Sequence, residues 1–375
     1  MSRPDLLPKD FYIIREKRIY VGVHIGAVIA RAAIVDSQHG DKMIHRNIDD
    51  REFKGDAPNY AKLIKGFVDD TMVNSQDKNI EALTVVFNKE LGQSDMFAFF
   101  ESVKSAILAL KVSKNVFVLH ECQMWRQLYF PTVNAWQKLE SNKIPISHYL
   151  DVGVLYGGTG SFFHLHDAKN FILCGGRGLF GDLGSAFTVS YMAIKSVMDH
   201  ADNGLTPGKD VSVLKQLIKK HFEVENAMEV ANCLQNQNGF DTHEFAGLAQ
   251  QMAEHKTDGM IKETFAAAGK FILRNISRFT ALQAETRRFK FPHKDVMILL
   301  VGKLYRSMEE LSDGFEQANE HFSSITWFRE ENKKIQDADV AAAIYGGHKS
   351  GAVGLFRPQL KVFKSKFVSA RRMSM

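Results

Sequence analysis

The chain has 375 residues, of which 45% are hydrophobic and 24% charged, a composition typical of globular proteins and too apolar for a disordered one. This length suggests two domains or one large one. The net charge of +5 comes from the C-terminal end, because the residues after Gly347 include seven Lys and Arg and no acid. The rest carries about −2, which excludes a nucleic-acid binder that is basic overall. We interpret residues 355–375 as a solvated, disordered basic tail, with weak contact to an anionic membrane or nucleic acid as the alternative.

The lengths of the apolar runs and the spacing of the cysteines indicate the compartment in which the protein acts. No apolar run approaches the roughly 18 residues of a membrane span, and no apolar segment follows a basic start at the N-terminus. Cys122, Cys174 and Cys233 lie more than 50 residues apart. That spacing excludes a disulfide framework and a cysteine zinc site, and it suits a reducing compartment. We therefore predict a cytoplasmic protein without a membrane span.

The first predicted elements form a β-meander. Apolar segments 19–23 and 29–35 flank a glycine-containing loop, and residues 42–46 pair back after a turn. The same plan returns about 130 residues later, over segments 149–155, 161–166 and 171–174. This weak internal repeat predicts two α/β domains that each open with a three-stranded antiparallel meander.

Helices and single strands are predicted after each meander. After the first come a helix near 60–72, a strand at 82–87, a helix capped by Ser94 that buries Phe97 and Phe100, a strand at 115–119 and a helix at 124–130. After the second come a helix at 185–200, helical periodicity over 211–290 with a break near Asp258-Gly259, a strand at 296–301 and a helix at 305–318. This alternation predicts an α/β fold of two domains, with a ligand in the crevice between them.

Two glycine-rich segments are candidates for ligand binding. The loop 156–161 joins two antiparallel strands, and its N–H groups with the hydroxyls of Thr159 and Ser161 can hold phosphate oxygens. The alternative is an ordinary tight hairpin. Segment 175–184 holds five glycines and leads into a long helix. Asp182 near that helix is either an N-cap or a residue that orients a small ligand or a metal.

A carboxylate follows the strand 115–119. Glu121, within His120-Glu121-Cys122, lies where α/β enzymes keep catalytic groups, at the carboxyl end of a buried strand. A solvated loop glutamate is the alternative. The histidines show no trusted metal-ligand spacing, so we predict no metal-binding residue.

These segments together resemble the eukaryotic N-acetylglucosamine kinases. The resemblance is carried by residues 174–186, 193–199 and 202–203, with Gly158–Ser161 at the distance of that family's second phosphate loop. The family belongs to the actin-like, hexokinase-like ATPase superfamily. The resemblance therefore implies an α/β fold of two ribonuclease H-like domains around a central cleft. We place the N-terminal actin-like ATPase domain at 18–130 and the C-terminal one at 131–354.

The resemblance also implies an activity and a site. These kinases are cytosolic homodimers that use ATP and Mg²⁺ to phosphorylate the 6-hydroxyl of N-acetylglucosamine, an amino sugar. By position, Glu121 is the catalytic base, and Gly302 and Lys303 bind the nucleotide. The implied sugar-binding residues are Gly176, Arg177 and Asp182, and the implied phosphate-binding residues are Gly26, Gly158, Thr159, Gly160 and Ser161.

The first phosphate loop departs from the family pattern of an acidic residue, three glycines and a threonine. Residues 24–28 keep only Gly26 of that pattern, with His24 in place of the Mg²⁺-anchoring carboxylate and Val28 in place of the hydroxyl. Losing one preorganised charge contact costs about 3–4 kcal/mol of transition-state stabilisation. We therefore weigh an ATP-dependent amino-sugar kinase against a catalytically degenerate homologue that binds a sugar or a protein partner. A plain actin-like scaffold is the third reading.

Overall fold

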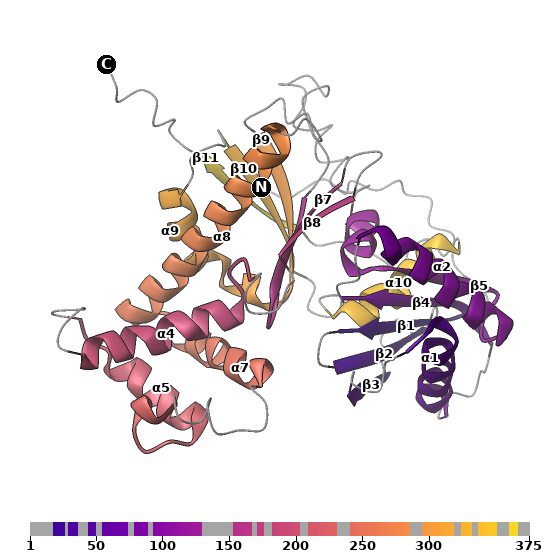
Figure 1. The fold of residues 1–375 in the computed structure, drawn as a ribbon, viewed down its shortest axis with the longest axis horizontal. Helices are drawn as coiled ribbons and strands as arrows, with labels where there is room; N and C mark the ends of the chain where they lie inside the picture. Colours follow the sequence, from indigo (N-terminus) through magenta and orange to yellow (C-terminus); the bar gives the residue numbers. More distant parts are fainter. Residues whose placement is uncertain are drawn as a thin grey trace, which may run out of the picture. The chain divides into compact units, whose positions relative to one another are not determined.

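The computed structural model describes residues 18–26, 29–36, 44–49, 55–73, 79–88, 93–129, 153–166, 171–175, 182–202, 209–230, 241–285, 295–318, 324–331, 337–350 and 360–366. The chain divides into two compact units, residues 1–146 with 330–361 and residues 147–329 with 362–375. Figure 1 shows their strands and helices.

The first unit contains a five-stranded sheet in the order β3-β2-β1-β4-β5. Strands β1, β2 and β3 form the predicted antiparallel meander, and β4 and β5 extend the sheet by parallel pairing. The strands span Ile19–Ile25 (β1), Ile29–Asp36 (β2), Ile44–Asp49 (β3), Ile80–Phe87 (β4) and Asn115–His120 (β5).

Helices cover both faces of this sheet. On one face, the Phe87 ring of β4 contacts Tyr60 in α1 (Ala57–Met72) and Phe100 in α2 (Gln93–Ala109). Side chains alternate along a strand, so Thr84 points to the opposite face, toward Gly346. Gly346 belongs to α10 (Ala338–Lys349), which makes the unit a three-layer α/β/α structure.

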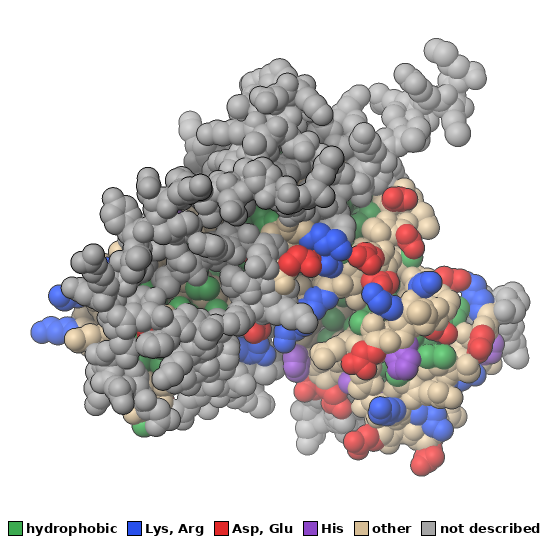
Figure 2. All heavy atoms as spheres, turned by 180° about the vertical axis from the view of Figure 1, so that it is seen from behind, with side chains coloured by type: hydrophobic (Ala, Val, Ile, Leu, Met, Phe, Trp, Pro, Cys, Tyr) green, Lys and Arg blue, Asp and Glu red, His purple; other side chains and the backbone are tan. Residues whose placement is uncertain are grey.

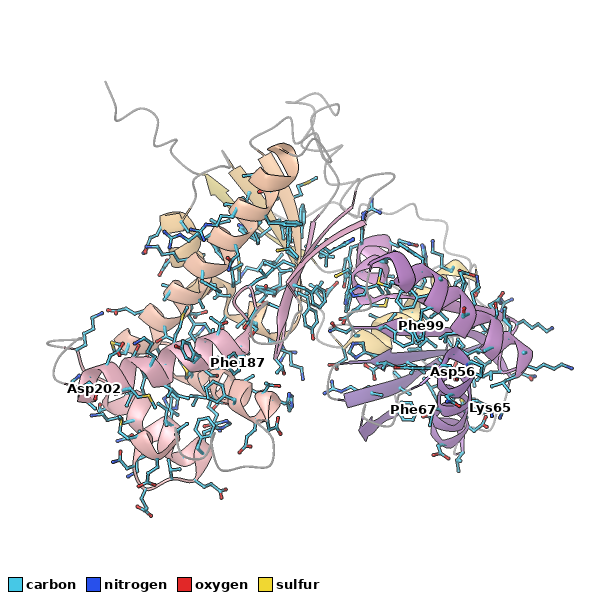
Figure 3. All side chains as sticks on the ribbon, viewed as in Figure 1. Asp56, Lys65, Phe67, Phe99, Phe187 and Asp202 are labelled. Atoms are coloured by element: carbon cyan, nitrogen blue, oxygen red, sulfur yellow. The ribbon has the colours of Figure 1, made fainter. Side chains whose placement is uncertain are left out.

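Local sequence explains two features of these helices. Asp56, at the start of α1 in Figure 3, caps that helix by accepting a 3.0 Å hydrogen bond from the Asn59 N–H group. Strand β1 has glycine at position 22, where a Cβ atom would lie 1.9 Å from the Asp339 carbonyl oxygen. The absence of a side chain there lets α10 lie directly on the strand.

The second unit contains a six-stranded sheet in the order β11-β10-β9-β6-β7-β8. Strands β6, β7 and β8 form the second predicted antiparallel meander, while β9 pairs in parallel with β6 and β10 pairs in parallel with β9. The strands span Gly153–Gly157 (β6), Ser161–His166 (β7), Phe171–Gly175 (β8), Asp295–Val301 (β9), Ser324–Glu330 (β10) and Leu360–Lys366 (β11).

A helical layer buries one face of this second sheet. Leu155, Ile298 and Trp327 of the sheet share one hydrophobic core with side chains from all five long helices. The long helices are α4 (Ala186–Ala201), α5 (Ser212–Phe222), α7 (Thr242–Met252), α8 (Gly259–Glu285) and α9 (Met308–Ala318), and the short ones are η5 (Ala227–Glu229), η6 (Ala253–His255) and η7 (Lys303–Ser307). The start of α8 at Gly259 confirms the predicted break.

The helices and the charged surface can be compared with the predictions from hydropathy and net charge. Among the described helices, none combines the length and the apolar character that crossing a bilayer requires. On the face drawn in Figure 2, the described Lys and Arg side chains are interspersed with Asp and Glu. The described part of that face therefore carries no large patch of one sign.

Three predictions about the chain's organisation are corrected. Residues 330–354 belong to the first unit, although they were assigned to the C-terminal domain, because α10 packs on β1. Residues 360–366 of the predicted disordered tail form the edge strand β11. Phe97 was expected in the core, but its side chain is 51% exposed, whereas Phe100 is buried as predicted.

Candidate functional site

The candidate base Glu121 lies in a buried polar cluster of the first unit. The His24 Nε2 atom lies 3.1 Å from Glu121 Oε2, and the Trp125 Nε1–H group donates a 2.9 Å hydrogen bond to Glu121 Oε1. Both carboxylate oxygens are therefore engaged. Glu121 is 1% exposed, so the solvated-loop reading is wrong.

Strand pairing brings His24 and Glu121 together across 97 residues of sequence. His24 lies near the end of β1, and Glu121 directly follows β5, with β4 between the two strands. Two strand spacings are about 9.5 Å, a gap that an imidazole and a glutamate can close over the end of β4. Trp125 is four residues further along the helix 121–129, so its side chain lies on the same helical face as Glu121.

Electrostatics keep Glu121 ionised. Burial raises the pKa of this carboxyl, but the His24 imidazole and the hydrogen bonds from His24 and Trp125 outweigh burial, so the pKa lies below its ordinary value. An ionised carboxylate only accepts hydrogen bonds, so His24 Nε2 carries the hydrogen of the pair. Burial also lowers the pKa of the neighbouring His120 to about 4, which leaves that imidazole neutral at pH 7.

The helix that carries Glu121 is itself held by a buried hydrogen bond. The Tyr129 hydroxyl donates to Glu330 Oε2 over 2.7 Å, and the Trp125 and Tyr129 rings stack with centroids 5.8 Å apart. Burial and the Glu330 charge raise the pKa of Tyr129 well above its ordinary value, so the hydroxyl stays protonated and donates. Glu121 is thus fixed both by its own partners and by the anchoring of its helix.

The first predicted phosphate loop is described only in part. Gly26 follows β1 and is buried, whereas Val28 lies outside the described residues. The chemical groups at the ends of β1 and β5 are an imidazole, from His24, and one carboxylate, from Glu121. Among the described residues, no three His, Cys, Asp or Glu side chains group closely enough to hold a metal ion.

In the second unit, Asp182 organises the start of α4. Its Oδ1 atom accepts from the N–H groups of Gly184 at 3.1 Å and Ser185 at 3.0 Å, and from the Ser161 hydroxyl. Its Oδ2 atom accepts from the hydroxyls of Ser185 and Thr188, both at 2.6 Å. The N-cap of α4 is Ser185 rather than Asp182, so the N-cap alternative is corrected by three residues.

The second predicted phosphate loop connects β6 and β7 in the same unit. Gly157 pairs with Ser161, and residues 158–160 form the hairpin tip. The Ser161 hydroxyl accepts a 2.7 Å hydrogen bond from the Leu183 N–H group, in addition to donating to Asp182. The Ser161 hydroxyl, a predicted phosphate-binding group, therefore already donates one hydrogen bond and accepts another within the protein.

One of the two predicted nucleotide-binding residues, Gly302, lies against the strand that leads into this loop. Gly302 has a φ of +104°, and a Cβ atom there would lie 2.2 Å from the Gly157 carbonyl oxygen, so only glycine fits. Lys303, which begins η7, is exposed. Gly302 therefore lies next to the end of β6 that leads into the loop 158–161, and its role in nucleotide binding stays a prediction. Gly176 and Arg177 lie outside the described residues.

Sequence reasoning missed three residues of these clusters. Trp125 had a readable signal, because it stands four residues after Glu121 on a predicted helix. Tyr305, whose ring lies 2.8 Å from the point where a Gly157 Cβ would be, and His243, whose Nδ1 lies 3.0 Å from Thr159 Oγ1, had none. Their positions depend on strand and helix packing that no local pattern encodes.

Comparisons with known proteins place the fold. No family model matches the chain. A candidate N-acetylglucosamine kinase from Porphyromonas gingivalis has a TM-score of 0.55 at 12% identity, covering 88% of this chain and 99% of that one. A candidate N-acetylglucosamine kinase from Chromobacterium violaceum has a TM-score of 0.49 at 13% identity, covering 88% and 98%. Glucokinase from Balamuthia mandrillaris in complex with glucose has 0.43 at 12%, covering 89% and 94%.

Such low identities establish the fold alone. The chain has a two-domain α/β fold similar to that of the Porphyromonas gingivalis protein. The predicted fold class is confirmed. The specific resemblance to eukaryotic N-acetylglucosamine kinases stays a prediction.

Proposed function

We propose that this chain is an amino-sugar-binding protein of sugar-kinase descent in which phosphoryl transfer has been lost. One observation carries the proposal. Glu121, the predicted base, is buried, and its two carboxylate oxygens are hydrogen-bonded, one to His24 and the other to Trp125. The sugar-binding part of the proposal is supported by the fold and by the 174–186 segment that resembles N-acetylglucosamine kinases.

A general base must approach the substrate hydroxyl to hydrogen-bond distance, about 2.6–3.2 Å. Here a sugar hydroxyl has to displace either His24 or the Trp125 N–H group from Glu121. Breaking a buried hydrogen bond to a charged group costs about 1.5–3 kcal/mol, and the displaced donor then loses its acceptor. The contacts that keep Glu121 ionised are thus the same ones that oppose its use as a base.

Magnesium does not fit the described groups of the first unit. Mg²⁺ prefers oxygen ligands in octahedral geometry, usually with one or two carboxylates. The carboxylate that follows β5 is already paired with an imidazole, and His24 occupies the position where the family pattern has an acid. We therefore derive no phosphoryl-transfer step through a metal at this site.

A second candidate function is ATP-dependent phosphorylation of the 6-hydroxyl of N-acetylglucosamine. The ionised state of Glu121 favours it, because a carboxylate is the form that accepts a proton at neutral pH. In that case Gly302, Lys303 and the loop 158–161 bind ATP. With either function we expect a cytoplasmic homodimer.

Two measurements on the same preparations separate these functions. The first is coupled ATP consumption with N-acetylglucosamine for the wild type, Glu121→Gln and Glu121→Asp, with the exposed Glu101→Gln as the matched control. The second is thermal denaturation with the sugar, since a ligand at 100 times its Kd stabilises by about 2.7 kcal/mol.

We expect the sugar to raise the melting temperature of all four proteins, while ATP consumption stays at the sugar-free background. Sugar-dependent ATP consumption that Glu121→Gln abolishes and Glu101→Gln spares would establish the kinase instead. No stabilisation by N-acetylglucosamine or other amino sugars would remove the sugar-binding proposal.

A further inference from the structure

The tip of the β6–β7 hairpin has its carbonyl groups turned toward α4. The N–H groups of Ala186 and Phe187 donate to the carbonyls of Gly158 at 2.9 Å and Thr159 at 3.4 Å, and the Gly158 N–H group donates to the Gly160 carbonyl at 2.9 Å. Among the described residues, the N–H groups of Thr159 and Gly160 have no acceptor. These two N–H groups are therefore available to a ligand.

The surroundings of Gly160 leave room for such a ligand. Gly160 is exposed, and a Cβ atom built on it meets no atom within 4 Å. A larger side chain would fit at this position, so steric crowding does not explain why residue 160 is glycine. Successive backbone N–H groups in a glycine loop form a concavity that suits an anion.

Helix packing adds a histidine to this tip. The Phe187 ring, labelled in Figure 3 on α4, lies 4.8 Å from the Phe245 ring of α7, which joins the two helices beside the loop. Asp241 caps α7 and accepts hydrogen bonds from the N–H groups of His243 at 2.8 Å and Glu244 at 3.2 Å. The exposed His243 side chain consequently reaches Thr159, with 3.0 Å between Nδ1 and Oγ1.

The His243–Thr159 pair presents a donor to an anion in either neutral tautomer. With hydrogen on Nε2, the Thr159 hydroxyl donates to Nδ1, and the Nε2–H group points away as a free donor. With hydrogen on Nδ1, the imidazole donates to the Thr159 oxygen, and the hydroxyl hydrogen becomes free. The amides of α7 do not contribute, because the Asp241 carboxylate already accepts from them.

We propose that His243, Thr159 and the Thr159 and Gly160 N–H groups form a phosphate-binding subsite, in which His243 is a ligand-binding residue supplied by the helical layer. This proposal rests on the prediction that loop 158–161 is a phosphate loop, and it adds a residue that lies outside the loop. The phosphate belongs either to a nucleotide or to a phosphorylated amino sugar.

The test is titration calorimetry of the full chain with inorganic phosphate at constant ionic strength. The variants are His243→Ala, Thr159→Val and the double variant, with the exposed His255→Ala as the matched control. A hydrogen bond to a charged group is worth about 1.5–3 kcal/mol, so His243→Ala should weaken phosphate binding about 10-fold or more. The double variant should lose less than the product of the single losses, because the two groups act as one pair.

Two further titrations identify the source of the phosphate. ATP and N-acetylglucosamine 6-phosphate are compared with phosphate-free N-acetylglucosamine, and the compound whose affinity falls with His243→Ala is the one that places its phosphate here. Unphosphorylated sugar should bind the wild type and His243→Ala equally, so a failure of the sugar-binding proposal remains distinguishable from a failure of this one.

The proposal is overturned if phosphate binding by His243→Ala stays within two-fold of the wild type, or if the wild type binds none of the three phosphates. Equal losses in His243→Ala and His255→Ala would also overturn it, because the effect would then be one of overall charge. Circular dichroism of each variant verifies that these exposed substitutions leave the fold unchanged.

Discussion

Replacing Trp125 by phenylalanine tests whether Glu121 is held by its partners. The substitution removes the 2.9 Å hydrogen bond to Glu121 Oε1 and keeps an aromatic ring next to Tyr129. The carboxylate is 1% exposed, so water does not readily replace the lost donor. We expect the local free energy of unfolding to fall by about 1.5–3 kcal/mol for the lost hydrogen bond. The smaller volume of phenyl relative to indole should lower it by roughly 1 kcal/mol more.

A double-mutant cycle with Glu121→Gln isolates the charge. In the single variant, the glutamine oxygen still accepts from Trp125, and its amide donates to His24 once the imidazole hydrogen moves to Nδ1. Glu121→Gln alone should therefore cost about 1 kcal/mol. In that background Trp125→Phe loses only a neutral hydrogen bond, so its cost should fall by about 1 kcal/mol.

Hydrogen exchange of peptides from β1 and β5 is the suitable assay, because a chain with two compact units need not unfold in a single transition. Protection in the second unit serves as the internal control. A loss below about 0.5 kcal/mol for Trp125→Phe would show that the indole does not hold the carboxylate. An equal loss in both backgrounds would show that the carboxylate charge plays no part.

Three further predictions concern stability. Because burial lowers the pKa of His120 to about 4, the unfolded chain gains a proton below pH 6.5 that the folded chain does not. The contribution of His120 to the free energy of unfolding should therefore be fully present above pH 6.5 and fall by about 3 kcal/mol toward pH 4. Urea unfolding of His120→Asn should show a flatter dependence of stability on pH. A Cβ atom on Gly314 would lie 1.8 Å from the Ala266 carbonyl oxygen, so Gly314→Ala should lower stability by about 1–3 kcal/mol in thermal melts, whereas Gly66→Ala, with open space, should raise it by up to about 1 kcal/mol. Tyr129→Phe removes the buried hydrogen bond to Glu330 and should speed exchange in residues 121–129 by the equivalent of about 1.5–3 kcal/mol; an unchanged rate would contradict this.

The sequence predicted both β-meanders and strands β4, β5 and β9, but not strands β10 and β11. Apolar segments on either side of glycine loops marked both meanders, because strand pairing between neighbours depends on local patterns. The helix α10 was assigned to the other unit, since no local pattern in the sequence shows that it packs on β1 at Gly22 and on β4 at Thr84. Strand β11 was missed because its lysines, at 361, 364 and 366, flank Val362 and Phe363, and we interpreted the segment as a charged tail rather than as an edge strand.

For the candidate site, the sequence located residues but not their states. Glu121 was placed after a strand, and His24 was interpreted only as a lost metal ligand. Their pairing requires the order β1-β4-β5, in which two segments 97 residues apart end at the same edge. Composition and periodicity carry no information on that order, so a replaced ligand and a new partner for Glu121 were indistinguishable in the sequence.

The candidate residues of the first unit and those of the second unit differ in their capacity to bind a ligand. In the first unit, each oxygen of the candidate base is bonded to another side chain, so a substrate must compete with the protein for it. In the second unit, Ser161 is engaged in the same way, but two N–H groups of the hairpin tip have no acceptor among the described residues, and a Cβ atom on Gly160 would meet open space. Binding a phosphate there needs no buried contact to break, whereas catalysis at Glu121 needs at least one. Changes around Glu121 that stop phosphoryl transfer do not alter the hairpin tip of the second unit. We therefore expect ligand binding to persist where phosphoryl transfer does not.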